Sequence, residues 1–258
     1  MYFEVLKGLM LPFLGTAVGA ACVFFIKKDF KKWLKVSISG FAAGVMIAAS
    51  VWSLLIPAME YETSLALGSL SFLPALFGLW VGVTFMLLID RFIPEFNFTE
   101  GSLSALGESK MLLLSVFIHN IPEGMAVGVA YAAYLSCASP DSLSGALALA
   151  LGIAIQNIPE GAIISTPLAS GGMKKAKAFG IGILSGIIEP IGGFLTVLAL
   201  SLVLPVLPIL LGFAAGAMIY AVIKELLPII SENKTSYAGV IFFAMGFSVM
   251  MMLDVALG

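Results

Sequence analysis

Charged and metal-binding side chains are scarce in this sequence. Of its 258 residues 11% are charged, one is histidine and two are cysteine, whereas 60% are hydrophobic and the mean hydropathy is +1.10. Cys22 and Cys137 have no Cys-x-x-Cys spacing, so neither a thiolate metal centre nor a redox pair is expected. The composition excludes an ordinary soluble domain, and no nucleic-acid partner is expected.

Long apolar runs take the place of the missing charges. A hydrocarbon core ~30 Å thick requires about 20 apolar residues in a helix, and eight runs reach that length. They are too long for the alternating strands of a β-barrel. We therefore expect an all-α integral membrane protein that forms a single transmembrane domain over residues 1–258. The eight predicted helices cover about residues 6–26, 36–59, 70–90, 111–135, 143–168, 176–203, 206–229 and 237–257.

The positive charges are distributed unequally among the connections between these helices. Five lysines lie in residues 27–35 and three in residues 174–177, both in odd-numbered connections, whereas the second, fourth and sixth connections contain no Lys or Arg. The positive-inside rule places such Lys-containing connections in the cytoplasm and therefore both termini outside. The lysine cluster follows the first apolar run, an order that does not fit a cleaved signal peptide.

An octapeptide recurs in two helices that run in opposite directions. GFAAGVMI begins at Gly40 and GFAAGAMI at Gly212, with seven of eight letters identical. Similar sequences in opposite orientation indicate an inverted repeat, as in many secondary transporters. We expect a 3+2+3 arrangement in which the first three and last three helices are repeats around a central pair. The alternative is that small residues recur in the two helices only for close packing.

Carboxylates lie near the middle of three predicted helices. HNIPEG at 119–124 and QNIPEG at 156–161 place Glu123 and Glu160 in two of them, and Glu189 lies in a third. An ionised carboxylate at this depth costs at least about 2.5–3.5 kcal/mol. No Lys or Arg lies at comparable depth in these helices, so the acids are protonated, solvated or neutralised by a bound cation.

The spacing of the polar residues favours the cation. His119 and Glu123 are four residues apart and share a helix face, and Gln156 and Glu160 repeat this spacing. Prolines next to the acids free backbone carbonyls, which membrane helices tolerate where they line a cavity. Hydrogen bonding between helices is the alternative role for such residues. The candidate metal ligands are His119, Asn120, Glu123, Gln156, Asn157, Glu160 and Glu189.

The kinds of ligand restrict the ion. One imidazole among carboxylates and carboxamides, without thiolate, suits a divalent metal of borderline to hard character. Zinc, iron(II), manganese and cadmium all fit, whereas copper(I) would require sulfur. The metal is then the substrate, and no resident cofactor is expected.

These residues resemble the ZIP (Zrt/Irt-like) family of divalent-metal transporters over nearly the whole chain, and Gln156 in place of histidine resembles its GufA-like branch. The resemblance implies a binuclear site. One metal position would use His119, Glu123, Gln156 and Glu160. The adjacent position would use Asn120, Asn157 and Glu189, with Glu123 and Glu160 as bridging ligands.

The resemblance also implies a mechanism and an assembly. Metal, with zinc foremost, would move toward the cytoplasm by elevator-like alternating access in a homodimer. The helices at 111–135 and 143–168, with parts of the first and sixth, would carry the metal. The helices at 36–59 and 206–229 would belong to the scaffold. The expected location is a bacterial cytoplasmic membrane, with lipid as the other partner.

Two other functions use the same residues. An intramembrane metal-dependent hydrolase would activate water on the metal, but the chain has no His-Glu-x-x-His pair and only one histidine. A proton or sodium channel fits the histidine and the carboxamides less well than a metal site does.

Overall fold

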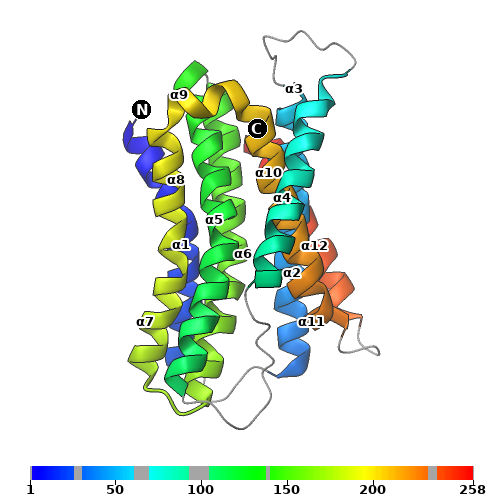
Figure 1. Cartoon of the computed structure of the whole chain (residues 1–258). Helices are drawn as coiled ribbons and strands as arrows, with labels where there is room; N and C mark the ends of the chain where they lie inside the picture. Colours follow the sequence, from blue (N-terminus) through cyan, green and yellow to red (C-terminus); the bar gives the residue numbers. More distant parts are fainter. Residues whose placement is uncertain are drawn as a thin grey trace.

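Helices make up the described chain. The computed structural model describes residues 2–25, 31–60, 70–92, 105–137, 140–231 and 237–257, and the side chains of residues 105–119 and of a few helix-end residues lie outside this description. The described residues contain α-helices with short 3-10 and π turns and no strand. The long helices run roughly along one axis (Figure 1).

The helices lie close to the predicted ranges. They are α1 (Tyr2–Ala21), α2 (Lys32–Ala49), α3 (Ile56–Glu60), α4 (Phe72–Phe92), α5 (Ala105–Cys137), α6 (Pro140–Ser170), α7 (Lys175–Gly186), α8 (Ile188–Leu198), α9 (Leu200–Val203), α10 (Leu207–Ala221), α11 (Leu227–Ser231) and α12 (Ala238–Leu257).

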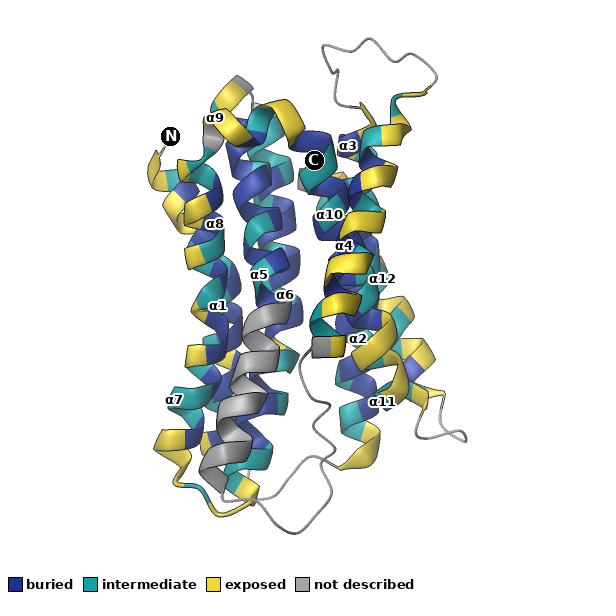
Figure 2. Cartoon of the chain, viewed as in Figure 1, coloured by how far each residue is buried: buried dark blue, intermediate teal, exposed yellow. Residues whose placement is uncertain are grey.

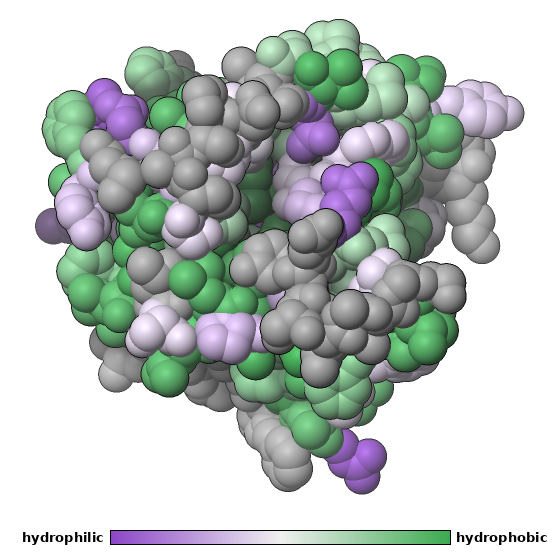
Figure 3. Space-filling view, turned by 90° about the horizontal axis from the view of Figure 1, so that it is seen from above, coloured by the Kyte–Doolittle hydropathy of each residue, from purple (hydrophilic) through white to green (hydrophobic). Residues whose placement is uncertain are grey.

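Seven helical spans among the described residues are long and apolar enough to cross a membrane. The eighth predicted span, 111–135, falls on α5, part of whose side chains lie outside the described residues. Exposed residues line the outer faces of the helices (Figure 2), and hydrophobic ones reach the perimeter when the molecule is viewed from the end that carries both termini (Figure 3). The chain is therefore an all-α membrane protein, as the sequence predicts.

The helices form two groups. One group contains α1, α5, α6, α7 and α8, and the other contains α2, α4, α10, α11 and α12 (Figure 1). Within the first group the closest pairs are α1 with α6 and α5 with α8; within the second they are α2 with α12 and α4 with α10. The groups meet where α6 contacts α2 and where α5 contacts α10.

Glycines allow each close pair to touch through its backbones. A Cβ on Gly15 or Gly19 of α1 would overlap a carbonyl oxygen of α6, and one on Gly124 of α5 would overlap the backbone of Glu189. Between lipid-facing helices such contact is a main source of association, because apolar side chains gain little by leaving lipid. The glycines therefore fix which helices pair.

The repeated octapeptide occupies equivalent places in the two halves. Gly44 of α2 packs on the backbone of α12, and Gly216 of α10 packs on the backbone of α4. The two helices run in opposite directions along the bundle (Figure 1). Each of these two close pairs thus joins one helix of the first three spans to one of the last three, and the inverted repeat relates the α2–α12 pair to the α10–α4 pair.

A π turn interrupts both repeats at the same distance from the first glycine. Residues Ser50–Leu55 follow α2 and Val222–Leu226 follow α10, each beginning ten residues after the glycine (50 − 40 = 10; 222 − 212 = 10). Pro57 and Pro228 lie just beyond the two π turns and lack a backbone donor. The extra residue in each turn is a feature that the octapeptide match does not reveal.

Two carboxylates of the second helix group lie beside the two π turns. Asp254 of α12 accepts a hydrogen bond from Ser53 Oγ in one π turn at 2.7 Å. Asp90 of α4 accepts one from Tyr220 Oη at 2.7 Å, and Lys224 Nζ in the other π turn lies 3.9 Å from its Oδ2. Each aspartate follows a glycine by eight residues (90 − 82 = 8; 254 − 246 = 8), which extends the repeat to α4 and α12.

The predicted helix at 176–203 contains two interruptions, although Lys175–Leu198 is long and apolar enough to be one membrane span. It is divided at Ile187 and again at Ala199, giving α7, α8 and α9. Pro190 has no N–H to donate to the Gly186 carbonyl. In the same region the Ile187 N–H bonds to the Leu184 carbonyl, three residues back, at 3.3 Å. The tighter turn places Glu189 in the first turn of α8.

Candidate metal centre

Polar residues from α5, α6 and α8 meet inside the first helix group. Glu123 is 4% exposed and Glu189 is 1% exposed, although both are acids in apolar helices. Glu160 lies one turn beyond Gln156 on α6 and is partly buried. The fully buried members of the cluster are Asn120, Glu123, Gln156, Asn157 and Glu189.

Glu189 is bound by donors from three other helices. Asn120 Nδ2 donates to its Oε1 at 3.0 Å and Asn157 Nδ2 donates to its Oε2 at 2.9 Å. Thr16 Oγ1 of α1 donates to Oε1 at 3.2 Å. Asn120 Nδ2 also reaches the Ser185 carbonyl at 3.2 Å. These bonds join α1, α5, α6 and α8 around one carboxylate.

A second, smaller set surrounds Glu123. Gln156 Nε2 donates to Glu123 Oε1 at 3.0 Å. Among the described residues, Glu123 Oε2, Gln156 Oε1 and Asn157 Oδ1 are buried and accept no hydrogen bond. Buried polar atoms rarely go unsatisfied, and each such group needs an explanation such as a bound ion. Carboxylate and carboxamide oxygens are ligands that a divalent cation accepts.

The helices that carry the cluster provide little positive charge. α6 and α8 contain no Lys or Arg, and the only one in α5 is Lys110, ten residues before Asn120. The ion pairs of Lys7 with Glu4 and of Lys224 with Asp90 belong to other helices. A cation at the cluster would offset the cost of burying Glu123 and Glu189.

The structure brings together most of the ligands predicted from the sequence. Asn120, Glu123, Gln156, Asn157 and Glu189 join through hydrogen bonds. His119 precedes Asn120 on α5, but its side chain lies outside the described residues. No three His, Cys, Asp or Glu side chains in the described part are close enough to hold one ion by themselves. A metal position there therefore needs amide oxygens or His119.

Thr16 is a member of the cluster that the sequence did not reveal. It is fully buried, and its side chain lies where a Cβ on Gly186 would overlap it. A lone threonine in an apolar helix gives no pattern that points to a site 173 residues away. Its hydroxyl orients Glu189 rather than joining the predicted ligand set.

We expect Thr16→Val to weaken zinc binding to the purified chain by about tenfold, the lower end of the cost of losing a partner of a metal ligand. Valine preserves the shape of the side chain but removes the donor to Glu189. Isothermal titration with zinc measures the effect, and Thr16→Ser, which retains the hydroxyl, is the matched control. Equal affinities for the valine and serine variants would show that the hydroxyl does not act on the site.

An all-α membrane domain with inverted repeats and a buried carboxylate and amide cluster at a broken helix is typical of a secondary transporter of cations. The model of the ZIP zinc transporter family matches residues 100–254. The chain belongs to this family, which confirms the resemblance inferred from the sequence.

Individual relatives match over nearly the full length. Zinc transporter ZIP11 of Xenopus tropicalis is 37% identical, over 99% of this chain and 97% of that protein. Zinc transporter ZIPB of Bordetella bronchiseptica is 33% identical, over 95% and 79%. Zinc transporter GufA of Myxococcus xanthus is 31% identical, over 95% and 96%. All three are named as transporters, which argues against an enzyme.

Proposed function

We propose that this chain transports divalent transition metal ions, with zinc foremost and cadmium, iron or manganese as further substrates, across the membrane toward the cytoplasm. The observation that carries the proposal is the buried pair Glu123 and Glu189, on helices poor in positive charge, beside amide oxygens that accept no hydrogen bond among the described residues. The names of the relatives support zinc as the metal.

We place two adjacent metal positions in the cluster. The first uses Glu123, Gln156 and Glu160, with His119 as a fourth ligand. The second uses Glu189 and the two asparagines, with the glutamates of the first position as bridges. Both asparagines direct their Nδ2 atoms at Glu189. An asparagine that binds metal beside Glu189 must therefore turn its amide to present oxygen.

The mechanism proposed is alternating access by an elevator-like movement. The cluster lies wholly within the helix group formed by α1, α5, α6, α7 and α8. The backbone contacts at glycine lie mainly within each group rather than between the two groups. Both features favour movement of the first group as a unit against the second, with the metal inside it.

The remaining proposals concern the surroundings of the protein. We propose eight spans, with α5 as the eighth, and both termini outside, from the distribution of lysines. A homodimer follows from the family resemblance. A bacterial cytoplasmic membrane is the proposed location.

Metal uptake by proteoliposomes that contain the purified chain tests the proposal. We expect saturable zinc uptake that cadmium, manganese and iron reduce in proportion to their affinity. Protein that is folded and monodisperse but moves none of these metals would contradict transport. Zinc-dependent hydrolysis by the same preparation would instead favour the alternative function, an intramembrane metal-dependent hydrolase.

A change at Asn157 tests the second metal position. We expect Asn157→Asp to raise the number of zinc ions bound per chain, because two carboxylates at hydrogen-bond distance require a cation or a proton between them. Equilibrium dialysis with radioactive zinc measures the number bound, and Asn157→Ala, which adds no charge, is the control. One zinc ion per chain in both the parent and the aspartate variant, at every free zinc concentration, would mean that no metal binds beside Glu189.

A further inference from the structure

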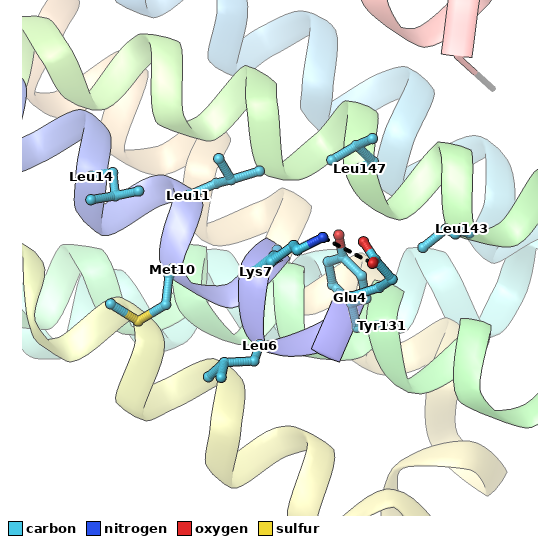
Figure 4. A pocket seen from close by; sticks show the side chains of 10 residues that line it. Glu4, Leu6, Lys7, Met10, Leu11, Leu14, Tyr131, Leu143 and Leu147 are labelled. Carbon is cyan, nitrogen blue, oxygen red and sulfur yellow. Dashed lines mark hydrogen bonds and ion pairs between the residues drawn. The ribbon is translucent and has the colours of Figure 1, made fainter. Parts of the chain in front are cut away.

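A groove separate from the metal centre lies near the N-terminal end of α1. Its volume is about 470 Å³, within the range of sites that bind small molecules. α1 forms one wall, and side chains from α5 and α6 complete the lining (Figure 4). Neither the proposed transport site nor its mechanism uses these residues.

The floor of the groove depends on one glycine. A Cβ on Gly8 would overlap the ring of Tyr131, so glycine lets the tyrosine of α5 pack directly beneath α1. Tyr131 is only 1% exposed. A large and fully buried side chain therefore closes the bottom of the groove.

The lining is charged at one end and apolar elsewhere. Lys7 Nζ and Glu4 Oε1 lie 3.0 Å apart beside Tyr131 (Figure 4). The apolar lining consists mainly of leucines, among them Leu11, Leu14 and Leu147. From Lys7 to Leu14 the helix rises about 10 Å at 1.5 Å per residue. The charged end therefore lies near the helix terminus and the leucines lie deeper in the membrane.

The ion pair can accept further partners. The Lys7 side chain is 54% exposed and that of Glu4 is 44% exposed. An ammonium has three donors and a carboxylate has several acceptor sites, so their mutual contact leaves bonding capacity in both. An exposed pair of this kind contributes little to stability. Its opposite charges at the mouth of an apolar groove match a ligand that also carries both signs.

We propose that the groove binds one phospholipid with a primary-amine zwitterionic headgroup, of the phosphatidylethanolamine class. Its phosphate accepts from Lys7, its ammonium donates to Glu4, and one acyl chain lies along the leucines of α1 and α6. A phosphatidylglycerol headgroup lacks the cation for Glu4. A phosphatidylcholine headgroup has a cation without N–H donors, so it makes no hydrogen bond to the carboxylate.

Native mass spectrometry of the full chain tests this binding directly. The purified protein is equilibrated with equal amounts of dioleoyl phosphatidylethanolamine, phosphatidylcholine and phosphatidylglycerol, and the lipid retained on the chain is counted. We expect about tenfold more of the amine lipid than of either competitor, the lower end of the discrimination that one charge-assisted hydrogen bond supplies. Glu4→Gln with Lys7→Gln should remove the preference.

A control variant carries the same change in charge outside the groove. Glu60→Gln with Lys177→Gln also neutralises one acid and one base, both on exposed residues, and should retain the preference. Equal retention of the three lipids by the parent, or a preference for phosphatidylglycerol, would overturn the proposal. So would an amine-lipid preference that survives in the Glu4 and Lys7 variant. None of these outcomes depends on zinc transport.

Discussion

Glu123→Gln is expected to reduce zinc uptake into proteoliposomes by more than about 100-fold, beyond the 10–100-fold that the loss of an outer partner of a metal ligand costs. Glutamine has nearly the same size and can still bond to Gln156. It removes the one negative charge that is fully buried between α5 and α6 and that has an oxygen, Oε2, without a hydrogen-bond partner among the described residues. A zinc ion at the proposed site then loses the carboxylate that would compensate for its lost water ligands.

The control for this variant is Glu60→Gln, which makes the same chemical change on an exposed residue at the end of α3. It should transport zinc as the parent does. Both variants must elute as folded protein in detergent. Parental uptake by folded Glu123→Gln would remove this glutamate from the transport site.

Gly161→Ala is expected to lower the free energy of unfolding by more than about 3 kcal/mol, the upper part of the range for overpacked cores. A Cβ at this position on α6 would overlap the Thr16 carbonyl oxygen of α1. Two backbones must then separate, since no flexible side chain lies between them to move aside. Unfolding in detergent with increasing dodecyl sulfate measures the change.

Gly145→Ala makes the same substitution on the same helix at a position where, among the described residues, no atom outside the adjacent helix backbone lies within 4 Å of a Cβ. It should be neutral or stabilising by up to about 1 kcal/mol, because alanine favours a helix over glycine. If both variants lost stability equally, close backbone contact between α1 and α6 would not be what holds this helix group together.

The sequence predicted the helices well because their signal is length and hydropathy, which each segment carries by itself. It missed the breaks at Ile187 and Ala199 and the two π turns. The break at Ile187 and the two π turns depend on how the backbone redistributes its hydrogen bonds near a proline, and apolar composition does not encode that choice. The octapeptide repeat indicated the symmetry, but the aspartates that extend it become visible only through their bonds to Ser53 and Tyr220.

The candidate site was predictable where its residues share a helix face and not where they come from elsewhere. Asn120 with Glu123 and Asn157 with Glu160 are one turn apart, so their spacing alone indicated a cluster. Thr16 reaches Glu189 only because glycines bring α1 against α6 and α7. The sequence also could not show that both asparagines would direct their nitrogens at Glu189.

The most direct test of the account is X-ray absorption spectroscopy of zinc bound to the purified chain. We predict a first shell of nitrogen and oxygen only, at about 2.0–2.2 Å, and loss of most of the bound zinc in Glu123→Gln. A sulfur shell at about 2.3 Å, or bound zinc that is unchanged in that variant, would contradict a metal centre formed by α5, α6 and α8.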